Sequence, residues 1–277
     1  MLGIFLIAIA ELFAEASTSI GKYEVAKKKE SLYAMGFLSS IWATIFLVAI
    51  GIYQDDFYFA LASLPTFLLR AGLEVILVFV TLNAILTAER STFTFLRTLT
   101  IPLLLVADFL LGYTLTVTQI FGVSLMAVAI LLLYINHGLS RRGKMLSVLS
   151  ALMAVGTITL YKYNITNYNS VAAEQAYLHA IVLIALIIAA WVRVRENVFR
   201  SLVKPVMLAQ SLLAGVATVF LSFAFLFAPA SVIMAAKRSF EVLAAILFGQ
   251  TYFKEKHVLL KLTAFTLVAA GVMLLVL

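Results

Sequence analysis

Long apolar runs separated by short connections divide this chain over its whole length. A helix that crosses a bilayer needs about 20 mostly apolar residues. Only helices or closed barrels satisfy all backbone groups in lipid. Ten runs of suitable length fit the sequence, at residues 2–21, 32–53, 65–86, 91–112, 117–136, 145–163, 170–192, 205–227, 229–250 and 258–277. The sequence therefore predicts an all-α membrane protein with ten transmembrane helices.

The composition excludes several other classes. Apolar residues make up 64% of the chain and charged residues 12%, whereas soluble domains are about half apolar and about a quarter charged. No cysteine is present, which rules out disulfides and thiolate metal sites. The sequence contains no phosphate-binding Gly-rich loop, no metal-ligand spacing and no nucleophile–base pair. We therefore expect neither an enzyme nor a bound cofactor.

Similar residues recur at a spacing of 140 positions. The matched pairs are Lys22 with Lys162, Pro65 with Pro205, Ser91 with Ser231, and Arg97 with Lys237. This offset indicates one five-helix unit used twice, at residues 1–138 and 139–277. Because each unit has an odd number of helices, the second must enter the membrane from the opposite side. Such inverted repeats can form states that open to opposite faces around a central site, which predicts transport by alternating access.

Lysine and arginine residues predict the orientation. Even-numbered connections hold only Lys162, and one of them carries Asp55 and Asp56. Odd-numbered connections hold fourteen cations, namely Lys22, Lys27, Lys28, Lys29, Arg90, Arg141, Arg142, Lys144, Arg193, Arg195, Arg200, Lys204, Lys254 and Lys256. The positive-inside rule then places the odd connections in the cytoplasm and both termini outside. The net charge of +7 is thereby assigned to orientation in a multi-pass inner membrane protein rather than to a nucleic-acid partner.

The last two runs of each half start with small residues and contain glycine near the end of the first run and within the second. The relevant stretches are Ser91-Thr92-Phe93-Thr94-Phe95-Leu96, Ile101-Pro102, Leu111-Gly112-Tyr113, Gln119-Ile120-Phe121-Gly122, Pro229-Ala230-Ser231, Phe248-Gly249-Gln250 and Ala269-Ala270-Gly271-Val272. In these features the chain resembles the drug/metabolite transporter superfamily in its ten-helix, EamA-type form. The resemblance implies a metabolite or drug carrier. The chain departs from it at Tyr113 and Gln250, where the family pattern has glutamate.

Charged residues inside the apolar runs are the candidate functional residues, because insertion of one costs roughly 2.5–3.5 kcal/mol and such residues are often functional. The candidates for substrate binding or coupling are Glu11, Glu15, Arg70, Glu74, Arg97, Lys237, Arg238 and Glu241, with His179 as a possible proton relay. A lone histidine on a helix is also compatible with a packing role.

Glu11 and Glu15 lie four residues apart and therefore share one helix face. Their counterparts at the 140-residue offset are Ala151 and Val155, so only one half carries the acids. Two close carboxylates in a low dielectric resist simultaneous ionisation, which favours proton coupling or cation capture. This N-terminal run also looks similar to the first helix of small multidrug resistance proteins, where a membrane glutamate alternates between proton and cationic drug. The alternative is an ion pair with Arg70, Arg97 or Arg238 that only joins helices.

The remaining charges allow two interpretations. Arg70 and Glu74 are four residues apart and most simply pair with each other. Arg97 and Lys237 are matched by the repeat, and together they would suit a substrate carboxylate or phosphate. Neutralisation of these two cations by Glu74, Glu241, Glu11 or Glu15 is the alternative.

The sequence as a whole favours a secondary transporter that moves a small metabolite or drug-like solute, as an exporter driven by proton exchange. The expected partners are the small-molecule substrate, protons and membrane lipids. A flippase for a lipid or lipid-linked substrate, and a non-transporting membrane scaffold, are the alternatives.

Overall fold

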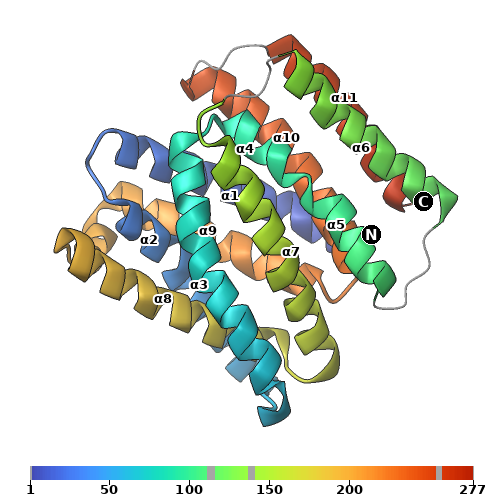
Figure 1. The fold of residues 1–277 in the computed structure, drawn as a ribbon. Coiled ribbons are helices and arrows are strands. Elements are labelled where there is room, and N and C mark those ends of the chain that lie inside the picture. Colours follow the sequence, from blue (N-terminus) through green and yellow to red (C-terminus); the bar gives the residue numbers. More distant parts are fainter. Residues whose placement is uncertain (1, 111–115, 137–140, 254–257, 277) are drawn as a thin grey trace.

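The computed structural model describes residues 2–110, 116–136, 141–253 and 258–276, and these residues form helices and connections without any strand. Figure 1 shows how the helices are arranged. Their bounds are α1 Leu2–Ala26, α2 Leu32–Tyr53, η1 Leu61–Ser63, α3 Leu64–Thr87, α4 Arg90–Arg97, α5 Thr100–Leu110, α6 Val117–Ile135, α7 Lys144–Asn167, α8 Val171–Val194, η2 Val198–Val203, α9 Pro205–Ala224, α10 Ala230–Phe253 and α11 Val258–Val276.

The all-α membrane class is supported by length and hydropathy. Each expected apolar run lies mainly on a helix. Within the described ranges, six segments are long and apolar enough to cross a membrane, namely Leu32–Tyr53, Leu61–Thr87, Arg90–Phe109, Lys144–Asn167, Val171–Val194 and Pro205–Ala224. The predictions made for Tyr113, Lys254 and Lys256 fall outside the described residues.

The fourth expected run is not one continuous helix, because it divides into α4 and α5. Pro102 has no N–H to bond the carbonyl of Thr98, and its ring crowds that carbonyl. The backbone instead makes tighter bonds from Thr98 N to Phe95 O at 3.1 Å and from Ile101 N to Thr98 O at 3.0 Å. Arg97 therefore ends α4 beside a break in the middle of the run.

Polarity is distributed as expected for a protein surrounded by lipid. Arg90 and Arg238 are 1% and 0% exposed, while Leu12 and Trp191 are 69% and 70% exposed. These two are among many exposed large apolar side chains, and extensive exposed apolar surface marks a membrane or protein contact. Several charged side chains thus lie inside the helix bundle, while large apolar side chains are exposed on its outside.

The principal helix contacts join the two halves of the chain. α1 packs against α9, α3 against α7, α2 against α8, and α6 against α11. α10 contacts α1, α4 and α5 in the centre. In Figure 1, α6 and α11 lie side by side at one edge of the molecule, away from α2 and α8.

Two of the cations assigned to cytoplasmic connections are buried instead. Lys22 lies within α1 and its Nζ donates to Ala88 O at 2.8 Å. Arg90 lies at the start of α4 and forms an ion pair with Glu15. The prediction was wrong for these two because α1 extends five residues beyond its expected end, and because an acid on α1 lies within reach of Arg90.

Close contact between α2 and α9 gives a test of the packing. A Cβ atom at Gly215 would lie 2.6 Å from Trp42 Cβ and 3.0 Å from Ala43 N. Overpacking of this kind costs typically about 1–3 kcal/mol, so Gly215→Ala is expected to lower the thermal unfolding midpoint of the purified protein. Gly72 has nothing within 4 Å, and Gly72→Ala is the matched control. Equal midpoints for the two variants would contradict this packing.

Candidate functional site

Two adjoining cavities lie inside the bundle. The first, which we call the α1 cavity, has a volume of about 210 Å³ and is lined by residues of α1, α2, α9 and α10. The second, the α3 cavity, has a volume of about 240 Å³ and is lined by residues of α3, α4, α7, α8, α9 and α10. Thr218, Leu221 and Lys237 line both cavities, so these three side chains form a shared wall between them.

All nine candidate residues lie on these cavities or on ion pairs beside them. Glu11 lines the α1 cavity. Those that line the α3 cavity are Arg70, Glu74, Arg97, His179, Lys237 and Arg238. Glu241 pairs with Lys237 and Arg238, and Glu15 pairs with Arg90. Residues from distant parts of the sequence thus meet at one place.

The two cavities use equivalent positions of the chain. Seven of the ten residues that line the α1 cavity have a counterpart on the α3 cavity at an offset of 140. These pairs are Ala14 with Ala154, Ser17 with Thr157, Thr18 with Ile158, Ser39 with His179, Ala214 with Glu74, Ala217 with Leu77, and Lys237 with Arg97. Positions 140 residues apart in the sequence therefore line equivalent parts of the two cavities.

Lys237 is held by two carboxylates. Its Nζ lies 2.5 Å from Glu11 Oε1 and 3.6 Å from Glu241 Oε2. Arg238 also pairs with Glu241, and its Nε donates to Thr100 Oγ1 at 3.4 Å. The second oxygen of Glu11, Oε2, is buried and has no hydrogen-bond partner in the described part of the chain.

Arg70 does not make the predicted pair with Glu74, because within the described residues its ion pair is with Glu174. Arg70 Nη1 lies 2.6 Å from Glu174 Oε1, and Nη2 donates to Gln175 Oε1 at 2.7 Å. The guanidinium also lies 4.5 Å from the centroid of the Tyr161 ring. These contacts join α3 to α7 and α8.

Glu174 is an important residue that the sequence analysis did not select. It is fully buried, and it accepts hydrogen bonds from Asn164 at 2.9 Å and from Asn169 at 2.6 Å. Its position one turn after the N-cap Ser170 is typical of an acid that stabilises a helix start. Its partnership with Arg70, 104 residues away in the sequence, follows from the tertiary packing and leaves no local signal.

Arg97 differs from the other interior cations. Among the described residues it has no acidic partner, and its Cζ lies 5.4 Å from the centroid of the Phe93 ring. Its Nε is buried without a hydrogen bond, as are Arg70 Nε and Arg238 Nη2. An unsatisfied buried donor costs about 1–3 kcal/mol. The wall of the α3 cavity thus includes three arginines, each with one buried guanidinium nitrogen that has no hydrogen-bond partner among the described residues.

The rest of the α3 cavity wall combines a few hydroxyl and amide groups with apolar side chains. Its apolar members are Leu77, Ala154, Ile158, Leu178, Leu221, Phe225 and Met234. Small-molecule sites typically have such a mostly apolar wall with a few placed polar groups. The arrangement suits a ligand that has one anionic end and an apolar body.

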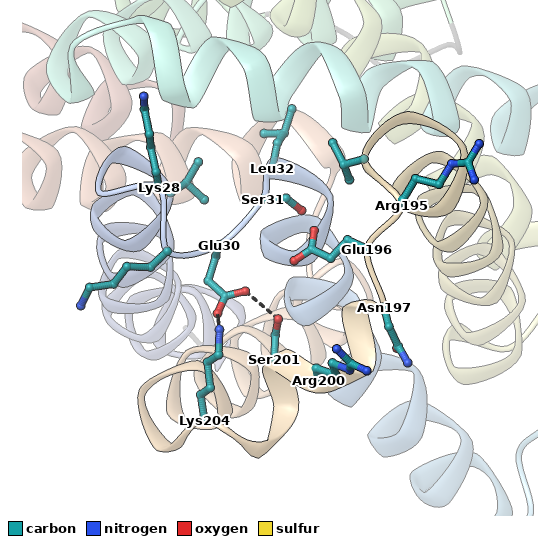
Figure 2. Close-up of a pocket in the computed structure, with 13 residues that line it drawn as sticks. Lys28, Glu30, Ser31, Leu32, Arg195, Glu196, Asn197, Arg200, Ser201 and Lys204 are labelled. Atoms are coloured by element: carbon teal, nitrogen blue, oxygen red, sulfur yellow. Dashed lines mark hydrogen bonds and ion pairs between the residues drawn. The ribbon is translucent and has the colours of Figure 1, made fainter.

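A third, larger hollow of about 790 Å³ lies between the α1–α2 connection and the segment from the end of α8 through η2 to the start of α9. Its cations are Lys28, Lys29, Arg195, Arg200 and Lys204. Figure 2 shows Glu30 directed at Ser201 and Lys204. Ser201 Oγ donates to Glu30 Oε2 at 2.6 Å, so this carboxylate ties the two connections together. None of the nine candidate residues lies here.

Comparisons with known proteins do not assign a family. No protein-family model matches the chain, and no curated protein matches it significantly. The resemblance to the drug/metabolite transporter superfamily therefore stays a prediction.

The Arg70–Glu174 pair provides a test of the buried charges. Removing one partner of a buried ion pair typically costs about 3–5 kcal/mol, because the other charge is left uncompensated. Arg70→Met is therefore expected to lower the thermal unfolding midpoint strongly. Arg70→Met combined with Glu174→Gln should recover much of the loss, since Gln keeps an acceptor for Asn164 or Asn169.

The control for this test is Lys29→Met. Lys29 pairs with Glu24 at 3.5 Å, but its side chain is 58% exposed. Exposed pairs contribute about 0–1 kcal/mol, so this variant should unfold like the wild type. A double variant less stable than Arg70→Met alone would contradict charge compensation between Arg70 and Glu174.

Proposed function

We propose that this protein is a secondary transporter that moves a small organic anion across a membrane by alternating access. The observation that carries the proposal is the α3 cavity, whose wall contains Arg97, Arg70 and Arg238, each with one buried N–H that has no partner among the described residues. A carboxylate or phosphate supplies the missing acceptors, and charge-assisted hydrogen bonds of this kind are among the strongest. The apolar wall then holds the body of the substrate.

The proposed duplication is supported by the contacts between helices. At an offset of 140 residues, α1 corresponds to α7 and α9 to α3, so the α1–α9 contact becomes the α7–α3 contact. At the same offset α2 corresponds to α8 and α6 to α11, so in each of these two contacts a helix packs against its own counterpart. A chain made of two copies related by a two-fold axis has contacts of this kind.

Two lysines make one equivalent hydrogen bond each. Lys22 Nζ donates to Ala88 O at 2.8 Å, and Lys162 Nζ donates to Ala228 O at 3.4 Å, besides a shorter bond to Phe225 O at 2.7 Å. Both the donors and the acceptors are 140 residues apart. In each half, a lysine of the first helix thus binds a carbonyl just beyond the third helix, which supports residues 1–138 and 139–277 as two copies.

Inverted repeats give these contacts a functional meaning. With α4 and α5 as one broken helix, each copy has five helices, and the copies cross the membrane in opposite directions. The protein then has ten crossings. Each copy contributes an equivalent set of positions to one cavity, and an exchange of conformation between the copies opens the centre to the opposite face. By the positive-inside rule, the basic odd-numbered connections lie on the cytoplasmic side of the inner membrane.

Proton coupling belongs to the same proposal. Glu15 is paired with Arg90, whereas Glu11 keeps one oxygen without a partner and lines the α1 cavity. Of the two acids singled out in the sequence, Glu11 is therefore better placed to exchange a proton with water entering the cavity.

The proposal predicts that anions stabilise the purified protein and that Arg97 is required. In a thermal-shift screen of carboxylates, phosphates, sulfonates, sugars, amino acids and cationic drugs, we expect the anions to raise the unfolding midpoint. Arg97→Gln removes hydrogen bonds to a charged group that contribute about 1.5–3 kcal/mol each, so it should weaken anion binding by an order of magnitude or more and abolish transport into proteoliposomes.

Arg200→Gln is the matched control, because Arg200 lies on the third hollow away from both cavities. It should leave anion binding and transport unchanged. Stabilisation by sugars or cationic drugs alone, or anion binding that survives Arg97→Gln, would overturn the proposed substrate class.

A further inference from the structure

Lys237 is the side chain common to both cavities that also carries a charge. It lines the α1 cavity with Glu11 and the α3 cavity with Arg97. Its ammonium group now contacts Glu11 and, at a longer distance, Glu241. Because lysine has a flexible stem with three donors, a change of rotamer can move this group from Glu11 toward a ligand in the α3 cavity.

The charges around the two cavities are formally balanced. Among the described residues, the cations on the cavity walls are Arg70, Arg97, Lys237 and Arg238, and the acids on the walls or paired with these cations are Glu11, Glu74, Glu174 and Glu241. Four positive charges thus face four negative charges. An anion that enters adds an uncompensated negative charge in a low dielectric, which is costly unless a proton enters as well.

Glu11 is the acid best placed to take that proton. Glu241 also pairs with Arg238, and Glu174 is held by Arg70. Glu11 has Lys237 as its ion-pair partner among the described residues, and its Oε2 has no partner. The other charged groups near it are Glu15 on α1, Glu241 on α10 and Arg97 on α4. Of the other helices that pack against α1, α3 carries Arg70 and Glu74, while α2 and α9 contain no charged residue.

We infer that Lys237 couples the two cavities, so that an organic anion and a proton bind together. The inference rests on the proposed function. When the anion enters the α3 cavity, the Lys237 ammonium leaves Glu11 Oε1 and donates to an oxygen of the anion. The Glu11 carboxylate then forms an O–H bond with a proton from the water on the open side. Release reverses both steps, and Lys237 keeps its own protons throughout.

This mechanism changes the expected direction of coupling. Proton exchange, which the sequence favoured, requires the proton and substrate to compete for the site. In the mechanism inferred here the anion and the proton bind cooperatively, because the charge of each compensates the charge of the other. An inward proton gradient would therefore drive uptake of the anion rather than its export.

Benzenesulfonate is a suitable probe because it stays anionic over the whole working pH range and carries no proton itself. We would titrate it into detergent-purified protein, measure affinity by calorimetry and record proton uptake with a pH electrode in unbuffered solution. The wild type is expected to take up about one proton per anion and to bind about tenfold more tightly for each unit decrease in pH where Glu11 is ionised.

Two variants separate coupling from a merely structural role. Glu11→Gln frees Lys237 from competition, so it should bind the anion at least as tightly as the wild type, independently of pH and without proton uptake. Lys237→Gln should bind about tenfold more weakly, also without proton uptake. Lys204→Gln, a lysine variant away from both cavities, should behave as the wild type.

The outcomes distinguish this inference from the proposed function. Arg97-dependent binding without proton uptake, or uptake that persists in Glu11→Gln, overturns the coupling through Lys237 and leaves the anion site intact. Weaker binding by Glu11→Gln also contradicts the competition for Lys237. If benzenesulfonate does not bind at all, the anion site fails and the coupling fails with it. If a variant does not fold, the wild-type measurements still decide whether the anion and a proton bind together, and absence of proton uptake there overturns the inference.

Discussion

The ion pair between Lys237 and Glu11 is the contact on which the interior of this protein depends. It joins α10 to α1 across the centre of the bundle and forms part of the wall between two cavities. In a low dielectric neither charge is stable alone, so each fixes the position of the other. Arg238 pairs with Glu241 and Arg70 with Glu174 for the same reason. Arg97, on the wall of the α3 cavity, forms no ion pair with a carboxylate among the described residues.

Helix positions followed directly from the sequence because lipid imposes a simple requirement on length and hydropathy. All expected runs lie mainly on helices, and the error at α1 is that the helix continues to Ala26, five residues beyond its expected end. The division into α4 and α5 could be inferred only locally, from Pro102. The number of crossings and the relation between the halves remain part of the proposal, supported by contacts that recur at the same offset.

The choice of ion-pair partners could not be read from the sequence. Spacing along one helix suggested Arg70 with Glu74, but the structure pairs Arg70 with Glu174, more than one hundred residues away. Arg90 was taken for a surface cation because it flanks an apolar run, yet it binds Glu15 in the interior. Local spacing identifies which charges enter the membrane region. Tertiary packing decides which of them meet, because several acids are equally compatible with each cation.

The break between α4 and α5 has a mechanical consequence. Pro102 corresponds at the 140-residue offset to Val242, and α10 is continuous there. The α4–α5 element is therefore a broken helix, while its counterpart α10 is one continuous helix. If the two halves exchange conformations during a transport cycle, the α4–α5 element can bend at Thr98, whereas α10 must tilt as one rigid helix. Under the proposed alternating access, the two openings would therefore require different deformations of the two halves.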